Sequence, residues 1–129
     1  MALDVRSCEH SGMPVTVLVV DDHPSFRAVA IALLTAGGFD VVGEANDGGS
    51  ALRQIMALRP DLVLLDIQLP DIDGFEVLRR LDLNGEGPAV VLISSRDASD
   101  FGQLLREGGS LGFISKGELS VDRLLELLP

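Results

Sequence analysis

Cysteine and large aromatic residues are nearly absent from this chain of 129 residues. Its single cysteine, Cys8, excludes an internal disulfide and a zinc site built from several cysteines. There is no Trp and no Tyr, and aromatic residues make up only 4% of the chain, so a core has to be built from Val, Leu, Ile and Ala. Hydrophobic residues still reach 47%, which excludes a disordered polar chain and is enough for one folded domain.

Positive charge is scarce as well. Ten Lys and Arg stand against twenty Asp and Glu, which gives a formal net charge of −10. Because affinity for nucleic acid depends on clustered Lys and Arg, we expect no direct contact between this domain and a phosphate backbone.

Long apolar runs are missing too. No segment approaches the roughly 18 apolar residues that cross a membrane, and residues 1–13 lack the apolar stretch of a signal peptide. Cys8 and His10 in that segment offer two metal ligands, which are too few for a site. We therefore expect a cytoplasmic domain over residues 14–129, preceded by a loose leader over residues 1–13 and without membrane contact.

Short apolar runs alternate with helical patterns along the rest of the chain. The runs are nearly continuous, as in strands of a parallel sheet that is covered on both faces. They lie at residues 15–20, 41–42, 62–65, 89–93 and 112–114. Apolar residues at helical spacing follow each run and begin at Phe26, Ala51, Phe75, Phe101 and Val121. Five strands alternating with five helices predict right-handed βαβ units and an α/β fold.

Polar residues follow the predicted strands at the edge where ligands bind in such sheets. They are Asp21 and Asp22 after the first strand, Asp66 after the third, Ser94 and Ser95 at the end of the fourth, and Lys116 after the fifth. Each has a common structural role when taken alone, because an acidic pair before a helix is often an N-cap. Lys116 is the chain's only lysine, and a single lysine is usually a solvated surface group.

Together these residues favour phosphoryl chemistry. Carboxylates gathered at one edge raise one another's pKa unless a cation lies among them, and oxygen ligands suit Mg²⁺. Lys116 can neutralise a phosphoryl group, and Asp66 can attack phosphorus to give an aspartyl phosphate. No glycine-rich loop follows the first strand, so a nucleotide phosphate would meet carboxylates there instead of backbone donors.

Three segments resemble the receiver domains of two-component response regulators. They are LVVDDHP at residues 18–24, DLVLLDIQLPDIDG at residues 61–74 and GFISK at residues 112–116, in the family's order. The resemblance covers residues 15–128, and DDHP followed by Phe26-Arg27 is most similar to receivers that precede a helix-turn-helix DNA-binding domain. It implies a flavodoxin-like, doubly wound fold, with five helices and a five-stranded parallel sheet of order 2-1-3-4-5.

The resemblance also implies a phosphoacceptor and a metal site. Asp66 would accept a phosphoryl group from a histidine kinase or a phosphotransfer protein. Asp22, Asp66 and the backbone carbonyl of Gln68 would bind Mg²⁺, with Asp21 helping through water. Gln68 occupies a position that tunes dephosphorylation in this family.

The remaining implied roles concern the switch. Lys116 would bind the phosphoryl group, Ser94 would be the switch hydroxyl, and Phe113 would turn inward on activation. Ser95 competes for the hydroxyl role, but the family's spacing to the lysine favours Ser94. Two positions depart from the family's pattern: Gly117 stands where many receivers have proline, and Phe113 lacks the hydroxyl of a tyrosine.

The predicted function is a phosphorylation-activated signalling switch, not a metabolic enzyme. Its downstream target would be a separate protein or a fused output domain, or a second copy of the chain bound upon phosphorylation. One alternative is a pseudo-receiver that docks without phosphate. Another is an aspartyl-phosphate phosphatase of the haloacid-dehalogenase type, but that class needs an Asp where this chain has Gln68. We interpret His23, beside the acidic pair, as a solvent-facing residue at a helix start.

Overall fold

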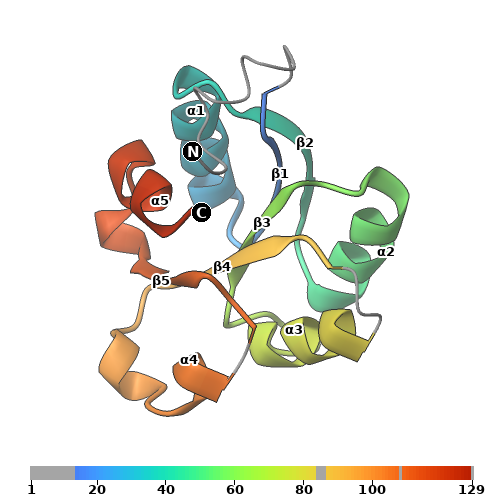
Figure 1. Cartoon of the computed structure of the whole chain (residues 1–129), viewed down its shortest axis with the longest axis vertical. Helices are drawn as coiled ribbons and strands as arrows, with labels where there is room; N and C mark the ends of the chain where they lie inside the picture. The colour runs from blue at the N-terminus through green and yellow to red at the C-terminus, as the bar shows by residue number, and fades with distance from the viewer. Residues whose placement is uncertain (1–13, 84–86, 108, 129) are drawn as a thin grey trace.

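A five-stranded parallel sheet forms the centre of the computed structural model, which describes residues 14–83, 87–107 and 109–128. Its strands are β1 (Thr16–Val20), β2 (Asp40–Ala45), β3 (Leu62–Asp66), β4 (Ala89–Ser94) and β5 (Gly112–Ser115). Their order in the sheet is β2-β1-β3-β4-β5, and every adjacent pair is parallel (Figure 1). The predicted fold class and strand order are confirmed. The predicted leader, residues 1–13, lies outside the described residues.

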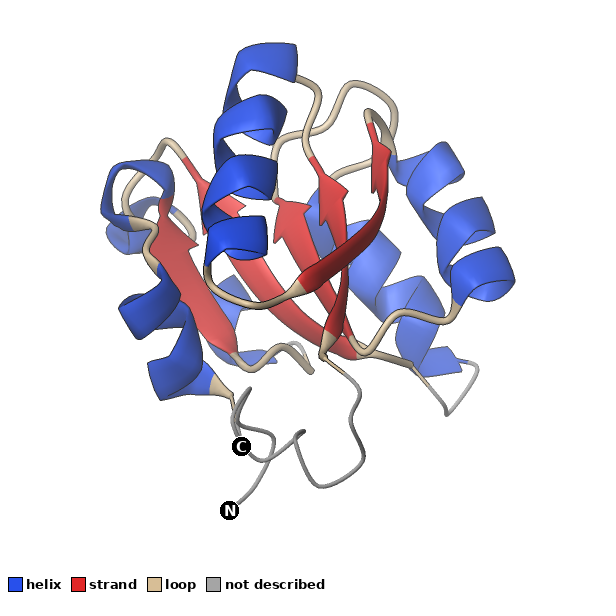
Figure 2. Ribbon diagram, turned by 90° about the horizontal axis from the view of Figure 1, so that it is seen from above, coloured by secondary structure: helices blue, strands red, loops and turns tan. Residues whose placement is uncertain are grey.

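Helices cover both faces of this sheet (Figure 2). They are α1 (Pro24–Ala36), α2 (Gly48–Leu58), α3 (Gly74–Leu83), α4 (Leu104–Glu107) and α5 (Val121–Leu127). Side chains of α1 and α5 pack on one face in a single apolar cluster, whereas α2, α3 and the segment around α4 pack on the other. None of the described helices has the length and apolar character needed to cross a bilayer.

The strand residues explain why two layers of helices form. Residues 17–20 of β1 are all fully buried, with Leu18 and Val20 in one cluster and Val17 and Val19 in the other. An alternating strand would present one polar face to water, but this strand has apolar side chains on both faces. Both faces therefore have to be covered.

The segment before β5 differs from the predicted helix. Apolar spacing places Phe101, Leu104 and Leu105 on one helical face, whereas the structure has a short 3-10 turn at Ala98–Asp100 and begins α4 only at Leu104. Gly102 between them adopts a φ of +54°, a left-handed conformation that a continuous helix does not allow. The glycine divides the predicted helix. Phe101 lies between the two helical segments and packs against the core.

Gly74 provides a test of how closely α3 approaches the end of β3. A Cβ at this position would lie 2.7 Å from the carbonyl oxygen of Asp66 and 2.9 Å from the Cα of Ile67, and both are backbone atoms. We expect Gly74→Ala to lower the free energy of unfolding by about 1–3 kcal/mol, because the backbone has to shift. Urea denaturation measures this. Gly117→Ala is the control, since a Cβ there meets no atom within 4 Å, and an equal loss in both variants would contradict the packing.

Candidate functional site

The carboxyl edge of the sheet gathers the polar residues predicted from the sequence. Asp21 directly follows β1, Asp66 ends β3, Ser94 ends β4 and Lys116 directly follows β5. Among the described residues, Asp21, Asp66 and Ser94 are the only polar or charged side chains that are buried, with exposed fractions of 0%, 2% and 0%. Buried carboxylates are costly unless paired, so their surroundings determine what this edge can do.

Lys116 pairs with both buried carboxylates. Its Nζ lies 2.6 Å from Oδ2 of Asp21 and 3.0 Å from Oδ2 of Asp66, and its side chain is 12% exposed. The ring of Phe26 in α1 lies 4.7 Å from the same nitrogen, within cation–π distance. Burial lowers the pKa of Lys116, but the hydrogen bonds to Asp21 and Asp66 outweigh it and raise the pKa above its ordinary value. The ammonium therefore keeps its charge between two carboxylates.

Asp66 is under opposing influences. Burial raises its pKa, whereas the backbone N–H of Gln68 and the ammonium of Lys116 lower it, and the pKa remains above its ordinary value. The N–H of Gln68 donates to Oδ1 of Asp66 at 3.0 Å, so both oxygens of this carboxylate have a donor nearby. Removal of water from this carboxylate is thus only partly compensated.

His23 is exposed, as predicted, but it also contacts the acidic pair. Its backbone N–H donates to Oδ1 of Asp21 at 2.7 Å. Its Nδ1 lies 3.2 Å from that oxygen and 3.1 Å from Oδ1 of Asp22, although the side chain is 65% exposed. This contact was not predicted from the sequence. The pattern places His23 at a helix start but does not tell which way its ring turns.

Arg27 is a second residue whose role the sequence analysis missed. One guanidinium nitrogen donates to the backbone carbonyl of Asp21 at 2.6 Å, and Nε donates to Oε1 of Glu44 at 2.8 Å. Glu44 lies in β2, where its own carbonyl accepts a hydrogen bond from Gln54 of α2. Arg27 thereby fixes the turn after β1 to the neighbouring edge strand.

Ser94 lies between the acidic site and two phenylalanine rings that contact each other, Phe101 and Phe113. Its Oγ accepts a hydrogen bond from the backbone N–H of Arg96 at 3.0 Å and donates to Oε1 of Gln68 at 3.5 Å. The guanidinium of Arg96 lies 5.7 Å above the ring of Phe101, whose centroid is 6.0 Å from that of Phe113. Ser95 is exposed, so the buried hydroxyl is the one predicted from the spacing.

The donor set of this edge fits a divalent cation. Asp21, Asp22, His23 and Asp66 each offer one ligand atom, and these atoms lie within 4.8 Å of one another. Oδ2 of Asp21 and Oδ1 of Asp22 are shielded from solvent, and the nitrogen beside each comes from a side chain, Lys116 for the first and His23 for the second. Three carboxylates beside one ammonium leave two negative charges uncompensated, and oxygen ligands suit Mg²⁺.

Comparison with known proteins identifies the family to which this fold and these motifs belong. The family model for the response regulator receiver domain matches residues 17–128. This chain belongs to that family. The resemblance drawn from the three sequence segments is thereby confirmed, and with it the link to two-component signalling.

Relatives of this receiver domain include regulators of transcription. A protein of Pseudomonas aeruginosa is 38% identical over 109 residues, which are 84% of this chain and 53% of that protein. The DNA-binding transcriptional activator EvgA of Escherichia coli is 29% identical over 104 residues, 81% of this chain and 51% of EvgA. The receiver thus spans about half the length of the curated relatives it matches.

Solved structures of receivers are similar over nearly the whole chain. The BeF₃-activated N-terminal receiver domain of Klebsiella pneumoniae RstA is 34% identical, with a TM-score of 0.77 over 87% of this chain and 94% of that one. A chain in the crystal structure of the CheX–CheY–BeF₃–Mg²⁺ complex of Borrelia burgdorferi is 27% identical, with a TM-score of 0.79 over 92% of this chain and 90% of that one.

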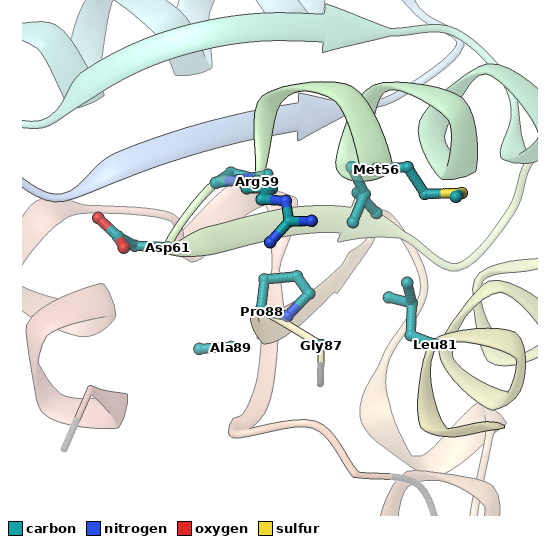
Figure 3. Close-up of a pocket in the computed structure, with 9 residues that line it drawn as sticks. Met56, Arg59, Asp61, Leu81, Gly87, Pro88 and Ala89 are labelled. Atoms are coloured by element: carbon teal, nitrogen blue, oxygen red, sulfur yellow. The ribbon is translucent and has the colours of Figure 1, made fainter. Parts of the chain in front are cut away.

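The receiver also has a cavity of about 460 Å³ at the amino-terminal ends of strands β3 and β4, opposite the acidic site (Figure 3). It is lined by the last turn of α2, the end of α3 and the segments that lead into β3 and β4. Its carboxylate, Asp61, accepts hydrogen bonds from both the N–H and the hydroxyl of Thr16. That carboxylate joins β1 to the start of β3, so its role there is structural.

The loop after Asp66 is anchored by Asp71. The two oxygens of this carboxylate accept hydrogen bonds from the N–H groups of Gly48 and Gly49, each at 2.8 Å, at the start of α2. Burial raises the pKa of Asp71, but several backbone N–H donors, those of Gly48 and Gly49 among them, together outweigh it and lower the pKa to about 2. The receiver loop that carries Gln68 is therefore tied to a helix N-terminus.

This anchor predicts a pH-dependent loss of stability. A carboxyl whose pKa is lower in the folded state stabilises the fold above its ordinary pKa, and the contribution is lost as the pH falls toward about 2. We expect Asp71→Asn to lower the free energy of unfolding at pH 7 by about 1 kcal/mol, since an amide oxygen replaces two acceptors. Urea denaturation between pH 7 and pH 3 should show this difference narrowing. Asp40→Asn, an exposed control on β2, should show no such difference; a pH-independent gap for Asp71→Asn would argue against the anchor.

Proposed function

We propose that this receiver domain is a phosphoacceptor switch in which Asp66 accepts a phosphoryl group in the presence of Mg²⁺. The observation that carries the proposal is the convergence on Asp66 of the Lys116 ammonium and two further carboxylates, with the Ser94 hydroxyl in contact with Gln68, two residues after Asp66. The presence of BeF₃ and Mg²⁺ in the complex that contains Borrelia CheY supports it by analogy.

In the proposed transfer, an oxygen of Asp66 attacks phosphorus of a phosphohistidine on a histidine kinase or phosphotransfer protein. A P–O bond forms to Asp66, and the bond from phosphorus to the imidazole nitrogen breaks with its electron pair left on that nitrogen. Asp22, Asp66 and the Gln68 carbonyl would hold Mg²⁺, with Asp21 acting through water. When bound, the ion supplies positive charge that stabilises the transferring group.

Lys116 and Ser94 complete the proposed acceptor site. The Nζ of Lys116 already lies 3.0 Å from Oδ2 of Asp66. Its ammonium can shift from this carboxylate oxygen to a negatively charged phosphoryl oxygen once Asp66 is phosphorylated. Ser94 can release its hydrogen bond to Gln68 and donate a hydrogen bond to the phosphoryl group instead. Because Gln68 lacks a carboxyl, the chain has no acid or base at the position that a haloacid-dehalogenase-type phosphatase requires.

The proposed output depends on the path from Ser94 to Phe113. A shift of Ser94 toward the phosphoryl group would disturb its hydrogen bond from Arg96, whose guanidinium covers Phe101. Phe113 packs beside Phe101, so its rotation inward would change the surface formed by α4, β5 and α5. We infer that this surface controls a downstream protein, a second copy or a fused output domain, because curated relatives are about twice as long and include DNA-binding regulators.

Phosphorylation of Asp66 is the direct test. Incubation with acetyl phosphate and Mg²⁺ should add the mass of one phosphoryl group to the parent chain and to the exposed control Asp40→Asn. Asp66→Asn should add none, with circular dichroism confirming that it folds. Intact-mass spectrometry decides the assignment, and equal labelling of Asp66→Asn would refute it. A parent that stays unlabelled under all conditions would favour the pseudo-receiver.

The switch is tested separately by NMR with beryllofluoride and Mg²⁺. We expect amide shifts near Asp66 and also along residues 94–101 and 112–115 in the parent chain. Ser94→Ala should keep the shifts near Asp66 and lose most of those around Phe113, because the hydroxyl that connects the two regions is gone. Shifts in the parent that stop near Asp66 would mean that the domain binds phosphate without switching by this route.

A further inference from the structure

His23 brings a nitrogen donor to a site otherwise made of carboxylates. Its Nδ1 faces Oδ1 of Asp21 and Oδ1 of Asp22 at 3.2 and 3.1 Å. The residue occupies the N-cap position of α1, yet its side chain makes no capping hydrogen bond to the helix. The ring is therefore directed to the carboxylates and not to the backbone donors that an N-cap side chain usually serves.

The two spacings match those of neighbouring ligands around one ion. Bonds of about 2.1 Å in octahedral geometry place adjacent ligand atoms about 3.0 Å apart. The two oxygens of Asp21 are also divided between partners, because Oδ2 lies against Lys116 and Oδ1 faces His23. Oδ1 of Asp21, Oδ1 of Asp22 and Nδ1 of His23 can thus meet one cation while Lys116 keeps its contact with Asp21.

The kind of donor atom determines for which ions the affinity of the site increases. Mg²⁺ prefers oxygen ligands, whereas an imidazole nitrogen favours Ni²⁺, Cu²⁺ and Zn²⁺. The 65% exposure of His23 leaves the ring open to an ion that arrives from solvent. Asp21, which the family's pattern assigns to a contact through water, would become a direct ligand in such a complex.

We propose that His23 makes the acidic site a mixed nitrogen and oxygen site that selects first-row transition-metal ions, with Nδ1 as a direct ligand. The inference rests on the proposed function, because it uses the carboxylates assigned there to Mg²⁺. Such an ion would occupy the position of Mg²⁺, so the metal supply would determine which ion accompanies Asp66.

The test compares two metals on the full chain. Cys8 and His10 are the other strong transition-metal ligands of the sequence, so every protein carries Cys8→Ser and His10→Gln. Calorimetric titration with NiCl₂ and with MgCl₂ gives the ratio of the two affinities. We expect His23→Gln, and His23→Asn as a second variant, to lower the Ni²⁺-to-Mg²⁺ affinity ratio by at least about tenfold. Pulsed EPR with one equivalent of CuCl₂ should detect imidazole ¹⁴N coupling in the His23 protein and none in either variant.

The outcomes separate this inference from the proposed function. An unchanged affinity ratio in both folded variants, or ¹⁴N coupling that persists in them, would overturn the role of His23 while leaving the Mg²⁺ site standing. Absence of Mg²⁺ binding in the His23 protein would instead count against the proposed function. Circular dichroism establishes that both variants fold. Asp22→Asn should weaken the binding of both metals, which confirms that the titrations report on this site.

Discussion

One ammonium held between two buried carboxylates is the constraint around which this domain is arranged. Lys116 follows β5, whereas its partner Asp21 follows β1 and its partner Asp66 ends β3, so the side chain has to reach across the end of β4. A long, flexible cation can do so, and β4 ends in the short side chain of Ser94. The contact therefore requires the parallel order of four strands to be correct, and it joins the two halves of the sheet through charge.

The contacts around Asp66 are of two strengths. The loop after it is held by Asp71, which accepts hydrogen bonds from the start of α2, and by the N–H of Gly74, which donates to the carbonyl of Ile67 at 2.7 Å. The route from Ser94 toward Phe113 uses a long hydroxyl contact of 3.5 Å, a guanidinium 5.7 Å from a ring centroid and ring-to-ring packing. Because the loop after Asp66 is firmly held and the contacts beyond Ser94 are weaker, the weaker contacts can rearrange without disturbing the loop.

Strand ends were the part of this molecule most open to prediction. The apolar runs place Asp21, Asp66 and Lys116 at one edge because parallel strands all end there, and the structure brings these three side chains together. β2 is longer than predicted, covering residues 40–45, since Asp40, Gly43 and Glu44 interrupt the apolar pattern of an edge strand. The direction of a ring or guanidinium has no periodic signature, which is why the contacts of His23 and Arg27 came only from the structure.

The presence of only one lysine has a practical consequence. Lys116 carries the only side-chain amine in the sequence, and that amine is largely covered and doubly ion-paired. Acylating reagents need an unprotonated, accessible amine, so they should react with this side chain slowly while the site is closed. The rate of acylation at one position thus becomes a chemical gauge of how often the ammonium leaves its carboxylates. For the same reason, immobilisation or crosslinking through lysine would select molecules in which Lys116 has separated from Asp21 and Asp66.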